Sequence, residues 1–292
     1  MGHQAGFVNI LGNPNVGKST MMNALVGEKL SIITSKAQTT RHRILGIVND
    51  ENYQIIYSDL PGILEPSYKL QEKMMGFIEL ALKDADIFVY MVEVGETKYH
   101  EKIVKKIIKS GVQTIVIINK IDLTTQEEVE KQMDYWSKVF PESQVIPISA
   151  LLNFNIQKLK DLIVEHLPES PAYYPKDEIS DKTVRFFISE IIREKILLYY
   201  KKEIPYSVEV EVDSYKEEDK LIRISTNIYV TRESQKMIII GKNGSAIKRV
   251  GTEARKDIEK FVGKQVFLEQ TVKVKKDWRD DEYQLKKFGY QT

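Results

Sequence analysis

The sequence predicts an α/β fold in which a domain with a mostly parallel sheet and helices on both faces precedes a smaller α+β domain. Short apolar strands alternate with amphipathic helices as far as about residue 167, which is typical of parallel sheets. The length of 292 residues exceeds what one core usually covers. Three prolines between residues 168 and 175 mark a break. We therefore expect domains at 1–167 and 181–292, joined by a stiff, extended linker at 168–180.

The elements of the first domain follow from apolar runs and the turns between them. Continuous apolar runs predict buried strands, and apolar residues recurring every three or four positions predict helices. The expected strands are Gly6–Leu11, Arg43–Asn49, Tyr53–Asp59, Asp86–Val94, Thr114–Asn119 and Gln144–Ser149, and the expected helices are Thr20–Val26, Lys102–Lys109, Gln126–Phe140 and Ile156–Leu167. In parallel sheets ligands bind beyond the carboxyl ends of the strands. Functional residues should therefore follow the strands directly.

The second domain shows the element order α-β-β-α-α-β. Alternation of apolar and polar residues predicts its strands, and wider apolar spacing predicts its helices. In chain order the expected elements are helix Thr183–Tyr200, strands Ser207–Asp213 and Leu221–Val230, helices Gln235–Ile240 and Ser245–Phe261, and strand Val266–Val274. The charged tail from Asp277 is expected to be helical, and Trp278 is expected to pack in a core rather than stack on bases.

Composition restricts the class of protein. There is no cysteine, which excludes disulfides and thiolate metal sites, and no apolar run approaches the roughly 18 residues of a membrane helix. We expect a cytoplasmic monomer. Residues 1–180 carry a net charge of −4, whereas residues 232–276 carry +7. A basic block of this kind favours a polyanionic partner, although a solvated charged surface is the alternative.

The segment after the first strand fits G-x-x-x-x-G-K-[ST], the phosphate-binding loop. Backbone N–H groups of such a loop, together with the start of the next helix, surround phosphate oxygens. Lys18 is placed to reach the β- and γ-phosphates, and the Ser19 hydroxyl to ligate Mg²⁺. The expected phosphate-binding residues are Gly12, Asn13, Pro14, Asn15, Val16, Gly17, Lys18, Ser19, Thr20 and, from a later motif, Gly62.

Three further motifs follow strand ends and together indicate a guanine nucleotide. Asp59-Leu60-Pro61-Gly62 fits D-x-x-G, in which the aspartate holds magnesium and the glycine meets the γ-phosphate. Asn119-Lys120-Ile121-Asp122 fits N-K-x-D, and Asp122 can accept two hydrogen bonds that guanine donates and adenine lacks. Ser149-Ala150 follows the last strand, where a backbone N–H can meet guanine O6. Asn119, Lys120, Asp122, Ser149 and Ala150 are the expected guanine-binding set.

These motifs resemble the translation-factor-related GTPases, and the stretch Ala37–Arg43 resembles the Era family in particular. The resemblance implies a GTP/GDP-binding domain with a P-loop fold. It also implies a switch I threonine that ligates Mg²⁺, for which Thr40 is the first candidate and Thr39 the second. With Ser19 and Asp59 this threonine completes the expected metal set. Switch II is expected at Asp59, Leu60, Pro61, Gly62 and Ile63.

Two residues bear on the rate of hydrolysis. Many small GTPases have glutamine after the D-x-x-G glycine, but this chain has Ile63, which cannot exchange protons with an attacking water. We therefore expect slow intrinsic hydrolysis. Related loops place a potassium ligand at the position of Asn15, so Asn15 is a candidate K⁺ ligand. The alternative is that Asn15 only stabilises the loop backbone.

The second domain carries a G-x-x-G loop between two helical segments, at Gly241 and Gly244. In KH modules such a loop clamps the backbone of single-stranded RNA, and the α-β-β-α-α-β order fits a type II KH fold. The expected RNA-binding residues are Ile240, Gly241, Lys242, Asn243, Gly244, Ile247 and Lys248. The stretches Ser189–Lys195 and Val272–Trp278 also resemble the Era family. Spacing alone thus indicates a guanine-nucleotide switch joined to an RNA module.

The Era resemblance implies a partner as well. It implies binding to the 3′ end of 16S ribosomal RNA and assistance in assembly and maturation of the small (30S) ribosomal subunit. One alternative is a peripheral membrane or cell-cycle GTPase whose basic half meets anionic lipid at the inner membrane. No strongly amphipathic basic helix supports it. Another is a tRNA-modifying GTPase, but no second catalytic constellation is evident in the sequence.

Overall fold

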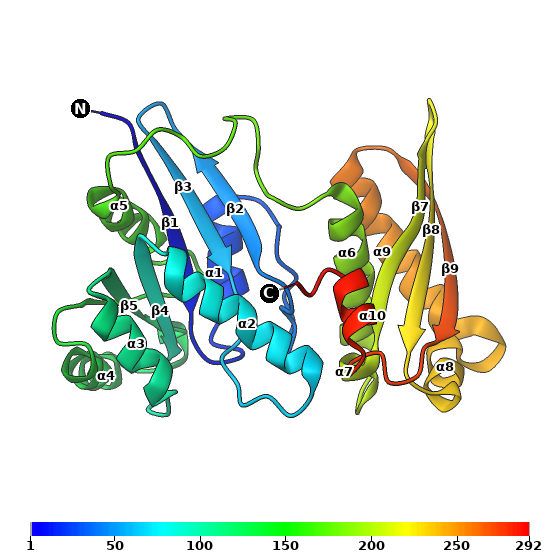
Figure 1. Cartoon of the computed structure of the whole chain (residues 1–292), viewed down its shortest axis with the longest axis horizontal. Helices are drawn as coiled ribbons and strands as arrows, with labels where there is room; N and C mark the ends of the chain where they lie inside the picture. The colour runs from blue at the N-terminus through cyan, green and yellow to red at the C-terminus, as the bar shows by residue number, and fades with distance from the viewer. Residues whose placement is uncertain (1, 292) are drawn as a thin grey trace.

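The computed structural model describes residues 2–291, and its first sheet has six strands in the order β2-β3-β1-β4-β5-β6 (Figure 1). The strands are β1 (Gln4–Leu11), β2 (Ile44–Asn49), β3 (Tyr53–Asp59), β4 (Ile87–Glu93), β5 (Gln113–Asn119) and β6 (Gln144–Pro147). All neighbours pair in parallel except β2 with β3, which form the predicted antiparallel hairpin. The predicted mostly parallel sheet is confirmed.

Helices cover both faces of this sheet. Helices α1 (Lys18–Val26) and α5 (Ile156–His166) share one apolar cluster with it, and α2 (Lys69–Asp84), α3 (Glu101–Ser110) and α4 (Gln126–Val139) share another. Strand β5 shows why its central run Ile115–Ile118 is uninterruptedly apolar. Ile115 and Ile117 face the first cluster, while Val116 and Ile118 face the second. A strand buried on both faces needs apolar residues at every position.

The second part of the chain builds a three-stranded sheet in the order β7-β8-β9. Strand β8 pairs antiparallel with β7 and parallel with β9, and α6 and α9 share its apolar core. The elements are α6 (Val184–Tyr199), α7 (Ile204–Ser207), β7 (Glu209–Glu217), β8 (Leu221–Val230), α8 (Glu233–Ile240), α9 (Ser245–Val262), β9 (Gln265–Val274) and α10 (Glu282–Lys287). The α+β character expected here is confirmed.

The segment expected to be an extended linker contains a turn, in which Glu178 N donates to Pro175 O (3.1 Å), and it does not stand free of the first domain. It runs along β2, where Ile47 N donates to Ile179 O (3.0 Å) and Leu45 N to Asp181 Oδ1 (3.0 Å). The Ser180 hydroxyl donates to Leu45 O at 2.6 Å. These bonds pair backbone groups that the outer edge of β2 would otherwise expose to other strands.

Other differences from the sequence-based expectations concern the tail and two helices. The elements expected from the sequence do not include helix α2, although its buried residues Leu70, Met74, Phe77 and Ile78 follow helical spacing. The short α7 was not predicted either. The tail is helical only over Glu282–Lys287. Trp278 is fully buried, as expected, but it shares an apolar cluster with α2 of the first domain.

The C-terminal segment therefore returns to the boundary between the two sheets, where α10 and the end of the chain lie (Figure 1). Leu70 N, at the start of α2, donates to Arg279 O at 2.9 Å, and Trp278 Nε1 donates to Ser207 O at 3.0 Å. Within residues 2–291 no helix combines the length and apolarity needed to cross a bilayer.

Candidate functional site

The loop between β1 and α1 requires both glycines of its motif. Gly12 has φ 151°, and a Cβ there would lie 2.1 Å from Met91 O. Gly17 has φ 105°, and a Cβ there would lie 2.3 Å from Asn119 Nδ2. Only glycine combines such φ values with so close an approach. The loop is thus pressed against β4 on one side and against the N-K-x-D segment on the other.

Lys18 lies beneath this loop and is bonded to it. Its Nζ donates to Gly12 O (3.1 Å) and Asn13 O (2.8 Å). Burial lowers the pKa of Lys18 to about 8, and the nearby Asp59 and Glu96 carboxylates oppose this shift. A buried ammonium with only carbonyl partners is poorly solvated, so an anion at the loop would stabilise its charge. This environment suits a phosphate group.

The three expected metal ligands converge, although they come from α1, switch I and β3. Ser19 Oγ lies 2.9 Å from Thr40 Oγ1 and donates to Asp59 Oδ2 at 2.7 Å. Thr40 Oγ1 also lies within 3.3 Å of that oxygen. Burial raises the pKa of Asp59, against the hydrogen bonds from the hydroxyls. Asp59 Oδ1 is buried and has no hydrogen-bond partner.

Thr39 and Thr40 differ in what their hydroxyl groups contact. Thr39 Oγ1 donates to Lys36 O at 2.6 Å and lies 2.6 Å from Thr34 Oγ1, so it closes the switch I loop on itself. The Thr40 hydroxyl faces Ser19 and Asp59 instead. The geometry therefore favours Thr40, the first of the two candidates.

The N-K-x-D and Ser-Ala segments meet at the carboxyl ends of β5 and β6. Asn119 Nδ2 donates to Val16 O (2.7 Å), and its Oδ1 accepts from Ala150 N (3.0 Å), so Asn119 ties the phosphate loop to the Ser-Ala turn. Ser149 Oγ donates to Asp122 Oδ1 at 2.5 Å. Asn119 thus supports the site, while Ser149 orients the Asp122 carboxylate.

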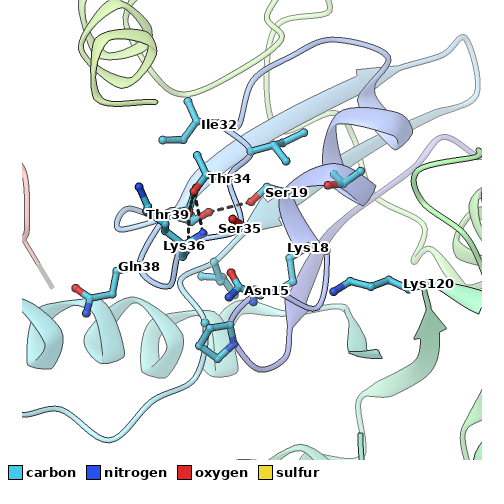
Figure 2. A pocket seen from close by; sticks show the side chains of 17 residues that line it. Asn15, Lys18, Ser19, Ile32, Thr34, Ser35, Lys36, Gln38, Thr39 and Lys120 are labelled. Atoms are coloured by element: carbon cyan, nitrogen blue, oxygen red, sulfur yellow. Dashed lines mark hydrogen bonds between the residues drawn. The ribbon is translucent and has the colours of Figure 1, made fainter. Parts of the chain in front are cut away.

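A cavity of about 300 Å³ lies between the phosphate loop and switch I. Figure 2 shows Lys18 and Ser19 at the start of α1, with Thr34, Lys36 and Thr39 in the loop facing them and Lys120 at another side. The predicted residues that line it are Pro14, Asn15, Gly17, Lys18, Ser19, Thr20, Thr39, Thr40, Leu60, Gly62 and Lys120. No arginine is among the lining residues within the described chain.

Three predicted residues near the cavity have structural contacts of their own. The Asn13 side chain points away from the cavity, because its Nδ2 donates to Glu96 Oε1 (2.6 Å) and Lys98 O (2.9 Å). A Cβ on Gly62 would lie 2.7 Å from Pro14 Cα, so only glycine lets switch II approach the loop so closely. The Ile63 side chain is buried in the core, with 3% exposed.

The G-x-x-G loop connects α8 to α9 in the second part of the chain. Gly241 has φ 71°, and a Cβ there would lie 2.6 Å from that of Ala246. Gly244 (φ 74°) and Asn243 (φ 52°) are also left-handed. Lys242, Asn243 and Lys248 are exposed, whereas Ile240 and Ile247 are half-buried against the core. The loop thus presents a cation and an amide on a tightly folded backbone.

Two family descriptions match the two halves of the chain. Residues 7–120 match the model for a 50S ribosome-binding GTPase, and residues 203–279 match the KH domain. Over 291 residues the chain is 47% identical to GTPase Era of Syntrophus aciditrophicus (strain SB), with 98% of this chain and 95% of that protein covered. The chain belongs to the Era family of GTPases.

Further comparisons agree with Era membership. GTPase ERA-like, chloroplastic, of rice (Oryza sativa subsp. japonica) is 45% identical, with 99% of this chain and 70% of that protein covered. A crystal structure of Era in complex with MgGDPNP and nucleotides 1506–1542 of 16S ribosomal RNA superposes with a TM-score of 0.95 at 39% identity. That match covers 99% of this chain and all of the other.

The structure adds side chains to the site that the motifs did not indicate. Thr34, Lys36 and Gln38 also line the cavity. The only indication in the sequence is that they precede the switch I threonine in the same loop. Motif spacing does not show which residues of that loop face the cavity. Arg41, from the same loop, points away from the cavity and is fully buried, with Nη1 donating to Val208 O at 2.7 Å.

Proposed function

We propose that this Era-family GTPase is a slow, Mg²⁺-dependent switch that binds the 3′ end of 16S ribosomal RNA and assists assembly and maturation of the small ribosomal subunit. The observation that carries the proposal is the match to Era bound to MgGDPNP and 16S rRNA along the full length of both chains. The rRNA named there belongs to that complex. This chain has both a nucleotide cavity and a G-x-x-G loop, which supports ribosomal RNA as its partner too.

The residues for Mg²⁺ are Ser19, Thr40 and Asp59. The buried Asp59 Oδ1, which has no partner, and the two converging hydroxyls form a hard oxygen donor set of the type Mg²⁺ prefers. When bound, the ion neutralises charge on the β- and γ-phosphate oxygens. Lys18 adds its ammonium at the phosphate loop, and Gly62 of switch II also lines the cavity. Residues Gly12–Thr20 surround the phosphates.

Asp122 is the residue proposed to select guanine. Its Oδ1 already accepts from Ser149, which fixes the carboxylate while leaving lone pairs for the N1–H and exocyclic amine of the base. Asp122 is exposed in this structure, so the bound base itself would remove water from the carboxylate. An adenine would then leave this acceptor without a donor, which is costly. In the Ser149-Ala150 segment, where a backbone N–H is expected to meet guanine O6, the N–H of Ala150 donates to Asn119 Oδ1 instead. This donor therefore supports the turn itself.

Slow turnover follows from what switch II lacks. The buried Ile63 cannot orient water, and the cavity lining offers no arginine within the described residues. Asn15 is exposed at the cavity with φ 66°, which supports a K⁺ ion as an additional positive charge at the phosphates. We retain Asn15 as the proposed K⁺ ligand.

The RNA-binding residues are proposed to be Ile240, Gly241, Lys242, Asn243, Gly244, Ile247 and Lys248. The glycines let the backbone approach phosphates, and Lys242 adds charge. We assign residues 1–167 to the GTPase domain, 168–180 to the linker and 181–292 to the KH domain with its tail; Met1 and Thr292 lie outside the described residues. We propose that the protein acts as a monomer in the cytoplasm.

The proposal is tested by crosslinking the full-length protein in a cell extract and identifying the RNA and the lipid that it captures. The expected result is recovery of the 3′ end of 16S rRNA. Recovery of lipid or tRNA alone would contradict the proposal and favour a membrane or tRNA-modifying role, neither of which is supported by an observation here.

A further inference from the structure

Helix α6 carries the stretch Ser189–Lys195, which lies in neither site described above. Its side chains nevertheless reach switch I, more than 150 residues earlier in the chain. Arg193 Nη2 donates to Thr39 O, and Glu194 Oε1 accepts from Ile33 N at 3.1 Å. Arg193 and Glu194 thus hold the backbone of the switch I loop at two points, both within the segment that lines the nucleotide cavity.

Arg193 is itself fixed by a partner on the same helix. Its Nε and Nη2 donate to the two carboxylate oxygens of Glu190 at 2.7 and 2.6 Å. The side chains are 1% and 6% exposed. The Glu190 carboxylate raises the pKa of Arg193 and so keeps it charged, although burial opposes this. A buried two-point pair restricts the guanidinium to one direction, which here is toward the Thr39 carbonyl.

The anchored carbonyl belongs to the peptide that leads into Thr40. Because the Thr39–Thr40 peptide is planar, holding its oxygen also restricts the backbone of Thr40. The Thr39 hydroxyl closes the loop through Thr34 and Lys36, and Lys36 Nζ donates to Leu197 O and Tyr200 O at the end of α6. The whole loop is therefore seated on this helix, with the Thr40 hydroxyl directed at Ser19 and Asp59.

We propose that Arg193 and Glu194 are positioning residues for Mg²⁺ coordination in the GTP state. They act through the switch I backbone. Arg193 fixes the position of Thr40 through the Thr39 carbonyl, and Glu194 fixes the first part of the loop through Ile33 N. The RNA-binding half of the chain thereby supplies supporting contacts to the nucleotide site. The inference rests on the proposed role of Thr40 as a magnesium ligand.

The experiment compares full-length Arg193→Lys with the wild type. Lysine keeps a charged partner for Glu190, but its single ammonium cannot hold that carboxylate at two points and the Thr39 carbonyl together. A second variant, Glu190→Gln with Arg193→Met, removes the pair without leaving a buried charge. The surface control is Arg223→Gln, because Arg223 Nε also donates to a glutamate (Glu218, 2.9 Å), but this pair is exposed and belongs to β8 of the second sheet.

Two measurements separate positioning from general stability. The first is the Mg²⁺ concentration that gives half-maximal retention of a fluorescent GDPNP, with fluorescent GDP as the reference. Loss of a residue that supports a metal ligand typically costs about 10–100-fold in metal affinity or activity. We expect a Mg²⁺ requirement higher by about tenfold for GDPNP, with GDP affinity unchanged. Because changing a buried ion pair also alters stability, each variant is measured well below its own melting temperature.

The second measurement is limited trypsin digestion, which reports loop order without any turnover. The switch I loop contains Lys36, Arg41 and Arg43, and cleavage there should be faster in both Arg193 variants than in Arg223→Gln. Folded variants with wild-type Mg²⁺ dependence and wild-type cleavage would overturn the inference.

Thr40→Val is measured alongside to keep the two proposals apart. If Thr40→Val raises the Mg²⁺ requirement and the Arg193 variants do not, the positioning role is wrong and the metal assignment stands. If Thr40→Val has no effect either, the metal assignment itself fails, and the inference fails with it.

Discussion

The hydroxyl oxygens of Ser19 and Thr40 lie 2.9 Å apart, and both face Asp59 Oδ2, although the two residues are 21 positions apart in the chain. Ser19 is the second residue of α1, directly after the phosphate loop, and Thr40 lies in the last part of the switch I loop. Their meeting at a buried carboxylate links three separate motifs into one oxygen donor set.

The first prediction separates Thr40 from its neighbour. Thr40→Val removes the hydroxyl that faces Asp59, so GTP hydrolysis at limiting Mg²⁺ should fall by at least about tenfold, the lower end for residues that merely support a metal ligand. Thr39→Val is the matched control, because the Thr39 hydroxyl bonds only within the loop. The rate is measured over a Mg²⁺ titration. Equal effects of both variants would contradict the assignment of Thr40.

The second prediction concerns the base. Asp122→Asn exchanges an acceptor for a donor, so guanine should be rejected and xanthine nucleotides accepted. A site built around a hydrogen bond discriminates by about 10⁴-fold. Binding of GDP and XDP is compared by competition. Asp134→Asn is the control, since Asp134 is exposed and pairs with Lys138 on α4. Unchanged GDP affinity in Asp122→Asn would show that another residue reads the base.

The nucleotide site was largely predictable from sequence, whereas the contacts of Arg193 were not. Motifs such as Gly12–Ser19 and Asn119–Asp122 have fixed spacing and follow apolar strands, so the fold of a parallel sheet brings them together. Nothing in a linear pattern indicates that Arg193 meets Thr39, 154 residues away, because that contact depends on how two domains dock. The burial of Trp278 agrees with the expectation, but a linear pattern does not indicate that Trp278 shares a cluster with α2 of the first domain, for the same reason.

Asn15 provides the third prediction. If a K⁺ ion beside Asn15 supplies positive charge at the phosphates, hydrolysis should be faster in KCl than in NaCl at equal ionic strength. Asn15→Ala should remove that difference while leaving GDP binding intact. Rates are measured in both salts for both proteins. Identical turnover of the wild type in potassium and sodium would exclude the ion.

The fourth prediction is a pH dependence centred on His42, which stacks on Tyr290 with ring centroids 4.1 Å apart. Burial lowers the pKa of His42 well below 6.5, and the charges of Lys182, Arg193 and Arg41 act in the same direction. The unfolded chain therefore takes up a proton near pH 6.5 while the folded chain does not. The stability associated with neutral His42 is present above pH 6.5 and is lost as pH falls toward the lower folded value.

This dependence is measured by urea unfolding at pH 7.5 and at pH 5.5 for the wild type and His42→Asn. The wild type should lose more unfolding free energy on acidification than the variant, because asparagine does not titrate. An equal loss in both proteins would show that His42 does not contribute to the acid sensitivity.

The central claim is that the G-x-x-G loop of this GTPase binds the 3′ end of 16S rRNA. The most direct test is a titration of full-length protein, with MgGDPNP, against a labelled RNA of that sequence at several salt concentrations. Lys242→Asp with Asn243→Asp changes two exposed residues without disturbing the glycines, and Lys216→Asp with Lys220→Asp removes more positive charge elsewhere in the domain. The account predicts that the wild type and the control bind the RNA tightly, and that the logarithm of their affinity falls with the logarithm of salt concentration by about 0.7 per phosphate contact. The loop variant should lose at least about tenfold in affinity, the effect of removing one hydrogen bond to a charged group. Equal binding by the loop variant and the wild type would contradict it.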